Sequence, residues 1–357
     1  MQMNLKLRLG AVAAITAALA FGAVAPAYAD PSSGKPLSGT GSDTTQDVMG
    51  GVASAVTALG SYDAIGSSTI TVNGTTFSRP SGSSAGVRAL SSSIRGIAYA
   101  GTVLPVGTLQ WARSSSLGSQ TGTELTYVPF ARDAVTIAMS ASSDFPKDVA
   151  MGAAGQPTNA FTLRNIYLGT VTSFIDSAGN TITIRPLLPQ VNSGTRQFWV
   201  SALGTTEAAL TAGGKATDLG NTVQEHDGSF LTTDGDIAPF SVGQFIAQGN
   251  YRTLPTTVVE RRGNIQLGSI DTIKPIVYDG TRVATNPDFG VSRLVYNVVE
   301  TRALTTATPS ATDSLIRSTF AGPTSTICQA TAQIQQYGFA TIGSQCGSTT
   351  AQRGYIN

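Results

Sequence analysis

The sequence has few charged residues and very few metal-binding side chains. Asp, Glu, Lys and Arg make up 12% of its 357 residues, and the formal net charge is +1. No cluster of Lys and Arg is present, which argues against a nucleic-acid partner or an anionic membrane surface. A single histidine without a Cys/His cluster argues against a structural zinc site. We therefore expect no metal and no cofactor.

Signatures of nucleotide chemistry are also missing. The chain has neither a Gly-x-x-x-x-Gly-Lys-Ser/Thr loop nor a convincing dinucleotide fingerprint. The lone His226 stands between Glu225 and Asp227 and invites a Ser-His-Asp hydrolase interpretation. Such a triad needs a histidine that is positioned by a separate carboxylate. We favour a surface or structural place for His226, in a loop near the mouth of a cleft, and predict that the protein is not an enzyme.

The first 29 residues are typical of a secretory signal peptide. Lys6 and Arg8 form a basic region, residues 11–25 are apolar, and Ala27-Tyr28-Ala29 fits the small-x-small cleavage site. The apolar stretch is too short for a confident membrane span. Because no cysteine stands at the cleavage point, we expect an exported protein, secreted or associated with the cell envelope, without a lipid anchor.

Cys328 and Cys346 are the two cysteines of the chain. An even cysteine count in an exported protein predicts one disulfide between them. A loop of about 19 residues closed in this way would stabilise the fold by about 3 kcal/mol on the chain-entropy model.

Strand-like and helical segments alternate along the chain. A strand at 69–72 precedes an Asn-Gly turn, and a helix is predicted over 46–59 from the spacing of its apolar residues. Two long β-rich runs lie at 127–139 and 291–299, and the C-terminal tail has mainly helical patterns. This alternation predicts an α/β protein with largely parallel sheets.

Hydroxyl-rich turns precede several predicted helices, as at 39–45, 80–86 and 193–196. A helix N-terminus presents unpaired N–H groups and partial positive charge, so such turns suit an oxyanion. Arg196 would add a guanidinium group. The ordinary alternative is that Ser193, and likewise Asp43, only caps its own helix.

Five segments carry a family resemblance, in order along the chain. They are GTGSDTT (39–45), GSSAGV (82–87), WARSS (111–115), IYLG (166–169) and SGT (193–195). Together they resemble the phosphate-binding proteins of bacterial ABC transporters, which have the type II periplasmic-binding-protein fold. The resemblance implies two lobes, each a mostly parallel sheet flanked by helices, joined by two hinge crossovers. We expect one lobe at 30–134 and 290–357 and the other at 135–289.

The resemblance also implies the ligand and its site. The ligand would be inorganic phosphate or a related oxyanion, bound between the lobes of a monomer and passed to an ABC permease. The predicted ligand-binding residues are Asp43, Thr44, Ser83, Ser84, Arg113, Ser115, Ser193, Gly194, Thr195 and Arg196.

The chain departs from the family at two places. The family has an aspartate where this chain has Ser115, and an arginine where it has Gln190. We expect Asp43 to replace the aspartate as proton acceptor and Arg196 to replace the arginine. Asp133 would pair with Arg132. The alternatives are a secreted scaffold for adhesion or partner binding and, further from the sequence pattern, a secreted hydrolase.

Overall fold

The computed structural model describes residues 30–31, 34–256 and 258–357. The predicted signal peptide therefore lies outside the described residues. Among the helices of the described part, none is long and apolar enough to cross a bilayer.

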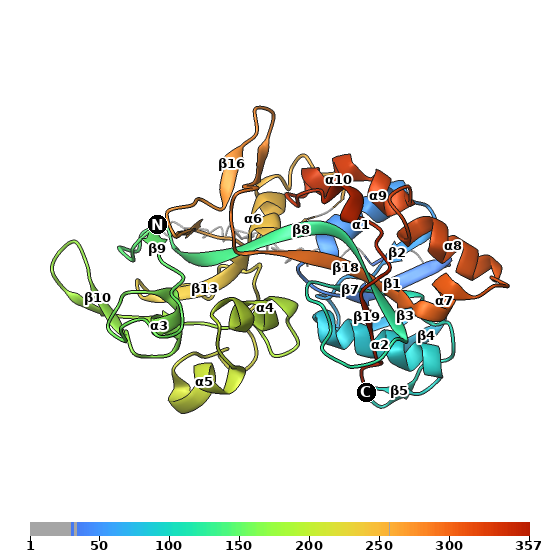
Figure 1. Ribbon diagram of the computed structural model, residues 1–357, viewed down its shortest axis with the longest axis horizontal. Coiled ribbons are helices and arrows are strands. Elements are labelled where there is room, and N and C mark those ends of the chain that lie inside the picture. The colour runs from blue at the N-terminus through green and yellow to red at the C-terminus, as the bar shows by residue number, and fades with distance from the viewer. Residues whose placement is uncertain (1–29, 32–33, 257) are drawn as a thin grey trace, which may run out of the picture.

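A mixed sheet runs through the molecule and extends into both lobes (Figure 1). Its strands, in spatial order, are β12 (Arg185–Pro186), β13 (Asp236–Ser241), β8 (Leu125–Ser140), β18 (Ser292–Glu300), β7 (Trp111–Ser114), β1 (Leu37–Gly41) and β2 (Leu59–Ser61). The pairs β12–β13, β1–β7 and β1–β2 are parallel. The two long strands run antiparallel to each other and to their neighbours β13 and β7. The predicted α/β class with two lobes is confirmed.

The strands β8 and β18 cross from one lobe to the other, side by side (Figure 1). They are the two long β-rich runs that the sequence indicates. Their pairing has one irregularity, between Val295 and Tyr296. Two shorter strands, β14 (Ile265–Leu267) and β19 (Gln352–Arg353), pair with opposite ends of β8. The lobe boundaries near residues 135 and 290 stay a prediction.

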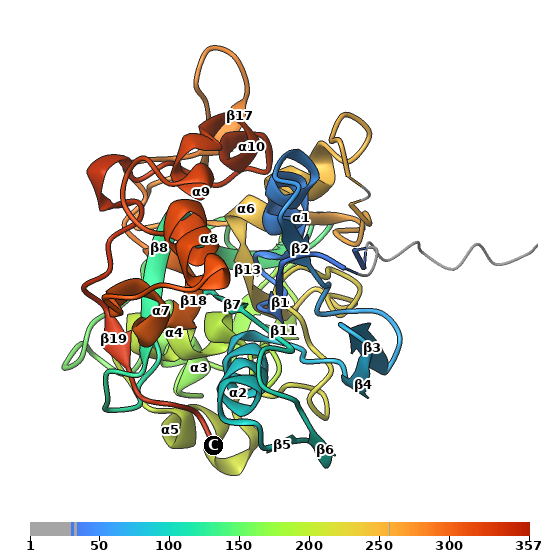
Figure 2. The ribbon, with the colours of Figure 1, turned by 90° about the vertical axis from the view of Figure 1, so that its right-hand side faces the viewer.

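Helices flank the sheet in both lobes, as Figure 2 shows for the lobe that contains both ends of the described chain. In that lobe they are α1 (Gln46–Ala55), α2 (Ser83–Arg95), α7 (Thr301–Thr305), α8 (Ala311–Phe320), α9 (Thr326–Gln329) and α10 (Thr331–Gln336), with the 3₁₀ turn η2 (Gly343–Gln345). In the other lobe they are α3 (Leu163–Tyr167), α4 (Gly194–Ala202), α5 (Glu207–Thr211) and α6 (Val242–Gly249), with η1 (Ala212–Gly214). The helix expected over 46–59 ends at Ala55, because the chain turns there and Leu59 begins the buried strand β2.

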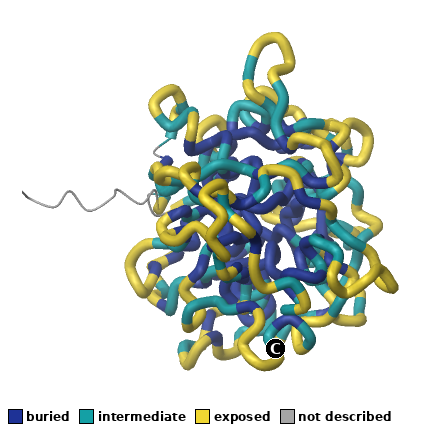
Figure 3. Tube along the Cα trace, turned by 90° about the vertical axis from the view of Figure 1, so that its left-hand side faces the viewer, coloured by how far each residue is buried: buried dark blue, intermediate teal, exposed yellow. Residues whose placement is uncertain are grey.

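Short two-stranded sheets lie outside the main sheet. They are β3 (Thr69–Val72) with β4 (Thr75–Ser78), β5 (Ala98–Tyr99) with β6 (Thr102–Val103), β9 (Asp148–Val149) with β15 (Ser269–Ile270), β10 (Ser173–Ile175) with β11 (Thr181–Thr183), and β16 (Ile276–Tyr278) with β17 (Val283–Thr285). The predicted Asn-Gly turn joins β3 to β4. Exposed loops lie mostly at the rim, whereas the buried segments gather in the middle of the molecule (Figure 3).

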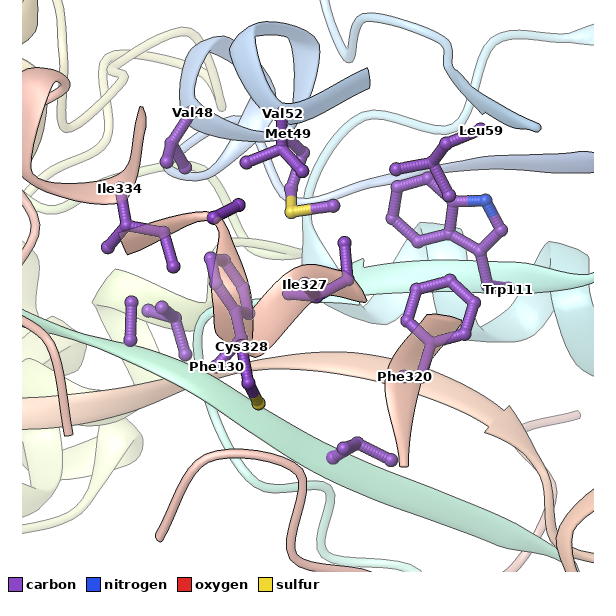
Figure 4. Packing of buried hydrophobic residues seen from close by; sticks show 14 of the residues in the cluster. Val48, Met49, Val52, Leu59, Trp111, Phe130, Phe320, Ile327, Cys328 and Ile334 are labelled. Carbon is purple, nitrogen blue, oxygen red and sulfur yellow. The ribbon is translucent and has the colours of Figure 1, made fainter. Parts of the chain in front are cut away.

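Large apolar side chains fill the interior of the first lobe (Figure 4). The rings of Trp111 and Phe320 pack with their centroids 5.6 Å apart. Gly39 lies against that indole, because a Cβ there would be 2.3 Å from the ring. The predicted disulfide is confirmed: Cys328 and Cys346 are bonded, with their Cα atoms 5.7 Å apart. Both cysteines belong to this core, so the disulfide ties the C-terminal tail to it.

Candidate functional site

The loop between β1 and α1 brings two predicted site residues, Asp43 and Thr44, into the interior. Both are fully buried. The loop packs closely on its neighbours, since a Cβ at Gly41, where φ is +132°, would be 2.5 Å from the Arg113 carbonyl oxygen. The Asp43 carboxylate accepts a hydrogen bond from the Thr44 N–H at 3.1 Å. The N-cap position of α1 is Thr45, not Asp43. The alternative that Asp43 serves only as the helix cap is therefore not what the structure shows.

Ser193 caps its helix and also contacts a carboxylate. It is the N-cap of α4, and its Oγ accepts hydrogen bonds from the N–H groups of Thr195 and Arg196. The same hydroxyl donates to Oε2 of Glu225 at 2.9 Å. A side chain that caps its helix is therefore also directed at an anionic group.

Hydroxyl groups from both lobes converge on the Glu225 carboxylate. Thr44 Oγ1 donates to its Oε1 at 2.6 Å, and Thr195 Oγ1 donates to the same oxygen at 2.8 Å. With Ser193, three hydroxyls hold the two oxygens of one fully buried carboxylate. We call Thr44, Ser193 and Thr195 the hydroxyl cradle.

Ser83, Ser115 and Gly194 lie beside the cradle. The Ser115 N–H donates to Ser83 Oγ at 3.0 Å, and Ser115 Oγ lies 3.4 Å from Thr44 Oγ1. A Cβ at Gly194 would be only 2.4 Å from Ser115 Oγ. The glycine thus allows the N-terminus of α4 to reach the serines of the opposite lobe.

Ser84 points to a different part of the interlobe contact. Its Oγ accepts a hydrogen bond from Gln197 Nε2 at 3.0 Å, and Gln197 Oε1 accepts one from Ser116 Oγ at 2.9 Å. The Ser84 N–H also donates to the carbonyl oxygen of Asn192 at 3.3 Å. Ser84 therefore fastens the two lobes together beside the cradle.

The two predicted arginines have partners outside the cradle. Arg113 is fully buried and donates to the carbonyl oxygens of Ser42 and Tyr62, at 2.9 and 2.8 Å. Burial lowers the pKa of Arg113 to about 10. Arg196 donates to the Pro189 carbonyl oxygen at 2.8 Å and pairs with Glu207 and Asp218. Because both guanidinium groups brace loops, we leave them out of the site proposed below.

Arg293 of β18 contacts both the hydroxyl cradle and Asp133. Its Nη2 donates to Thr195 Oγ1 at 2.7 Å and to Asp133 Oδ2 at 2.9 Å. The expected pairing of Asp133 with Arg132 is wrong, because Asp133 instead faces Arg293 and the start of α6. There it accepts bonds from the Ser241 hydroxyl at 3.0 Å and the Gly243 N–H at 3.1 Å. Burial still raises the pKa of Asp133 above its ordinary value.

Asp43 and His226 form a second buried pair next to the cradle. Asp43 Oδ2 lies 3.8 Å from His226 Nδ1 and accepts a long bond from Gln190 Nε2 at 3.4 Å. Burial, and secondarily the charge of Glu225, raises the pKa of Asp43 well above its usual value. Burial lowers the pKa of His226 well below its usual value, and the charge of Arg261 adds to this. The imidazole is therefore neutral.

We expected a surface or structural place for His226, and the surface alternative is wrong. The side chain is fully buried, and neither ring nitrogen has a hydrogen-bond partner among the described residues. The segment 82–86 does fit the Gly-x-Ser-x-Gly pattern of hydrolases. Its central Ser84, however, is bonded to Gln197, and a catalytic triad requires a histidine that is bonded to its nucleophile. This geometry gives no support to the hydrolase interpretation.

Comparisons with solved structures identify the fold. A protein described as the substrate-binding protein of a phosphate ABC transporter from Clostridium perfringens, solved with bound phosphate, superposes with a TM-score of 0.50. The two share 15% identity over 87% of this chain and 100% of that one. An ABC-type phosphate transport receptor from Vibrio cholerae gives a TM-score of 0.51 at 14% identity, over 86% of this chain and 100% of that one. The chain has the fold of the phosphate-binding proteins of ABC transporters. No protein-family model and no curated protein matches its sequence.

Within this phosphate-binding-protein fold, sequence reasoning missed two residues of the site. Glu225 was noticed only as a neighbour of the lone histidine, and Arg293 only as part of a long β-rich run. The available signals were the single histidine flanked by two acids and an arginine inside a predicted buried strand. Both signals become meaningful only when the chain has brought α4, β18 and the loop before β13 together.

Proposed function

We propose that the protein is an exported solute-binding protein that binds inorganic phosphate or a similar oxyanion between its lobes, for uptake by an ABC transporter. One observation carries the proposal. The cradle hydroxyls, which come from both lobes, are directed at the two oxygens of a single carboxylate, that of Glu225. Arg293 supports the cradle through Thr195. Donors placed in this way bind any oxyanion of suitable size.

The Glu225 carboxylate holds the position that the ligand would take. A phosphate oxygen and a carboxylate oxygen accept the same hydroxyl hydrogen bonds, so the ligand has to displace Glu225. Hydrogen phosphate keeps a proton that must find an acceptor, whereas sulfate has none at neutral pH. Asp43, beside the cradle, is placed to accept that proton and to disfavour a fully deprotonated anion.

Ligand contacts from both lobes would favour the closed arrangement of the molecule. We propose that the lobes comprise residues 30–134 with 290–357, and residues 135–289. The crossover strands β8 and β18 would then serve as the hinge. The mature chain would act as a monomer and pass its ligand to a permease.

Calorimetry of the chain from Asp30 to Asn357 tests the proposal, with phosphate, sulfate and molybdate as ligands and a chelator in the buffer. We expect phosphate to bind at one site and to raise the melting temperature by mass action. Ser193→Ala and Thr195→Ala should each weaken binding by about 1–3 kcal/mol, the value of a hydrogen bond to a charged group. The exposed Ser229 offers a control, since Ser229→Ala should leave the affinity unchanged.

If none of the three anions binds at millimolar concentration, the result would contradict the proposal and favour a role in adhesion or partner binding. Hydrolysis of a phosphoester or carboxylic ester by the pure protein would instead favour an enzyme. A response to sulfate alone would retain the oxyanion site but overturn the assignment of phosphate.

A further inference from the structure

Three side chains with metal-binding atoms meet in the interlobe interior. Asp43, Glu225 and His226 each place one ligand atom so that these atoms all lie within 4.8 Å of one another. All three side chains are fully buried. They come from two distant loops, the one after β1 and the one before β13, so their meeting depends on the tertiary fold.

The hydrogen bonds of the described residues do not satisfy all the polar atoms of this group. Both ring nitrogens of His226 are buried and lack a hydrogen-bond partner in the part of the chain that the structure describes, although Nδ1 lies 3.8 Å from Asp43 Oδ2. Two buried carboxyl groups, those of Asp43 and Glu225, lie next to that ring and would repel each other if both were ionised. A proton shared by Asp43 and Glu225 would relieve the repulsion but would leave the imidazole without a partner. A divalent cation would satisfy all three groups at once.

We propose that Asp43, Glu225 and His226 form a binding site for a divalent transition-metal ion, with Zn²⁺ as the ion that fits the donor set best. One imidazole nitrogen and two carboxylate oxygens are ligands that zinc accepts, with a fourth position open to water or an anion. Bonds of about 2.0–2.2 Å to the ion place tetrahedral ligands roughly 3.4 Å apart. Since the three ligand atoms lie within 4.8 Å of one another, they need to approach one another by at most about 1.4 Å.

The surroundings fit a ligating role for these groups. His226 is fully buried, and no described residue hydrogen-bonds to either ring nitrogen, so a nitrogen lone pair is available for a metal ion. Ligating carboxylates in proteins are themselves hydrogen-bonded by neighbouring groups that orient them. The cradle hydroxyls supply such bonds to Glu225, and the Thr44 N–H supplies one to Asp43. The proposal does not rest on phosphate binding, because all three ligands belong to the chain.

Titration calorimetry of the untagged mature chain, after treatment with a chelator, tests the site in phosphate-free buffer. We expect one Zn²⁺ per chain and much weaker binding of Mg²⁺, which has little affinity for imidazole. His226→Gln should lower the zinc affinity at least about a hundredfold, since it removes the nitrogen ligand. Asp227→Asn is the matched control in the same loop, because Asp227 lies outside the cluster and caps a turn at Ser229.

A second measurement tests the site in the wild type, so that the proposal can still be tested if a variant folds poorly. The chain contains one histidine, so isotope-labelled His226 gives a single imidazole signal that zinc should shift in the wild type and in Asp227→Asn. The proposal is overturned if zinc leaves this signal unchanged, or if His226→Gln, folded by circular dichroism, binds zinc as tightly as the wild type. Zinc binding without a phosphate response would reject only the oxyanion proposal, and the reverse result only the metal proposal.

Discussion

Two buried aspartates in the same interlobe region have opposite environments. Asp133 and Asp43 are both fully buried. Asp133 accepts bonds from Arg293, Ser241 and the Gly243 N–H, at 2.9 to 3.1 Å. Asp43 has the neighbouring Thr44 N–H, a long bond from an amide, and a histidine at 3.8 Å.

The difference in partners between Asp133 and Asp43 indicates different roles for the two carboxylates. Asp133 has a cation and two further donors that offset part of the cost of its burial, and it joins β8, β18 and the start of α6 in this way. A buried carboxylate that lies beside another carboxylate and an unpartnered imidazole is not compensated. Such strongly perturbed groups are more common at binding sites than in ordinary cores. By this criterion Asp43 is the candidate for a binding role, whereas Asp133 connects structural elements.

The largest expected effect comes from breaking the compensated group. Arg293→Met would leave the Asp133 carboxylate buried without its cation, and such changes destabilise by about 3–5 kcal/mol. His226→Leu, by contrast, replaces a buried ring without hydrogen-bond partners and should change the free energy of unfolding by less than about 1 kcal/mol. Urea unfolding of the two variants measures both values. Equal losses of stability would abolish the distinction between the two groups.

Asp47, on α1, is a further buried carboxylate, and it should make the stability of the protein depend on pH. Its Oδ2 is buried and has no hydrogen-bond partner among the residues that the structure describes, and burial, with the charge of Asp63, raises its pKa to about 7. The folded state therefore binds a proton more tightly than the unfolded chain, so this group should lower stability as pH rises from about 4 to about 7. At 1.36 kcal/mol per pKa unit the loss is at most about 4 kcal/mol.

Asp47→Asn should remove this dependence. The melting temperature of the variant should exceed that of the wild type at pH 8, and the advantage should shrink toward pH 5. Thermal unfolding at several pH values measures it. A constant difference between the two proteins across this range would show that Asp47 is ionised throughout.

Glu225→Gln tests whether the carboxylate competes with the ligand. The change removes a negative charge from the cradle, and we expect phosphate affinity to rise about tenfold, or about 1.4 kcal/mol. Glu207→Gln is the control, because Glu207 is half exposed and pairs with Arg196 away from the cradle. Calorimetry with phosphate measures both. Weaker binding by Glu225→Gln would instead make Glu225 a group that accepts the proton of the bound phosphate.

The smallest expected effect is a change in the selectivity for phosphate over sulfate. Asp43→Asn should reduce phosphate affinity several-fold while sparing or improving sulfate affinity, since an amide oxygen accepts a proton less well but does not repel sulfate. Competition between the two anions measures the ratio. An unchanged ratio would remove Asp43 from the recognition of the ligand.

The prediction of the hydroxyl residues depends on a local signal. Ser193 can be recognised from the sequence as a helix cap, and the structure shows that it is one. Thr44 and Thr195 follow from short motifs in the same way. The two arginines were predicted from sequence proximity alone, and proximity along the chain does not determine where a long side chain points. Arg196 accordingly turns to Glu207 and Asp218.

The sequence by itself determined the alternation of strands and helices, the long crossover strands, the disulfide partners and the hydroxyl-rich helix starts. These features depend on periodicity, turn chemistry and composition within short windows. The tertiary structure alone decided that Glu225 fills the cradle, that Arg293 supports it and that His226 is buried beside Asp43. The contacts of Thr44 with Glu225, of Thr195 with Arg293 and of Asp43 with His226 join residues more than 90 positions apart, and only the packing of the two lobes around β8 and β18 fixes which of them meet.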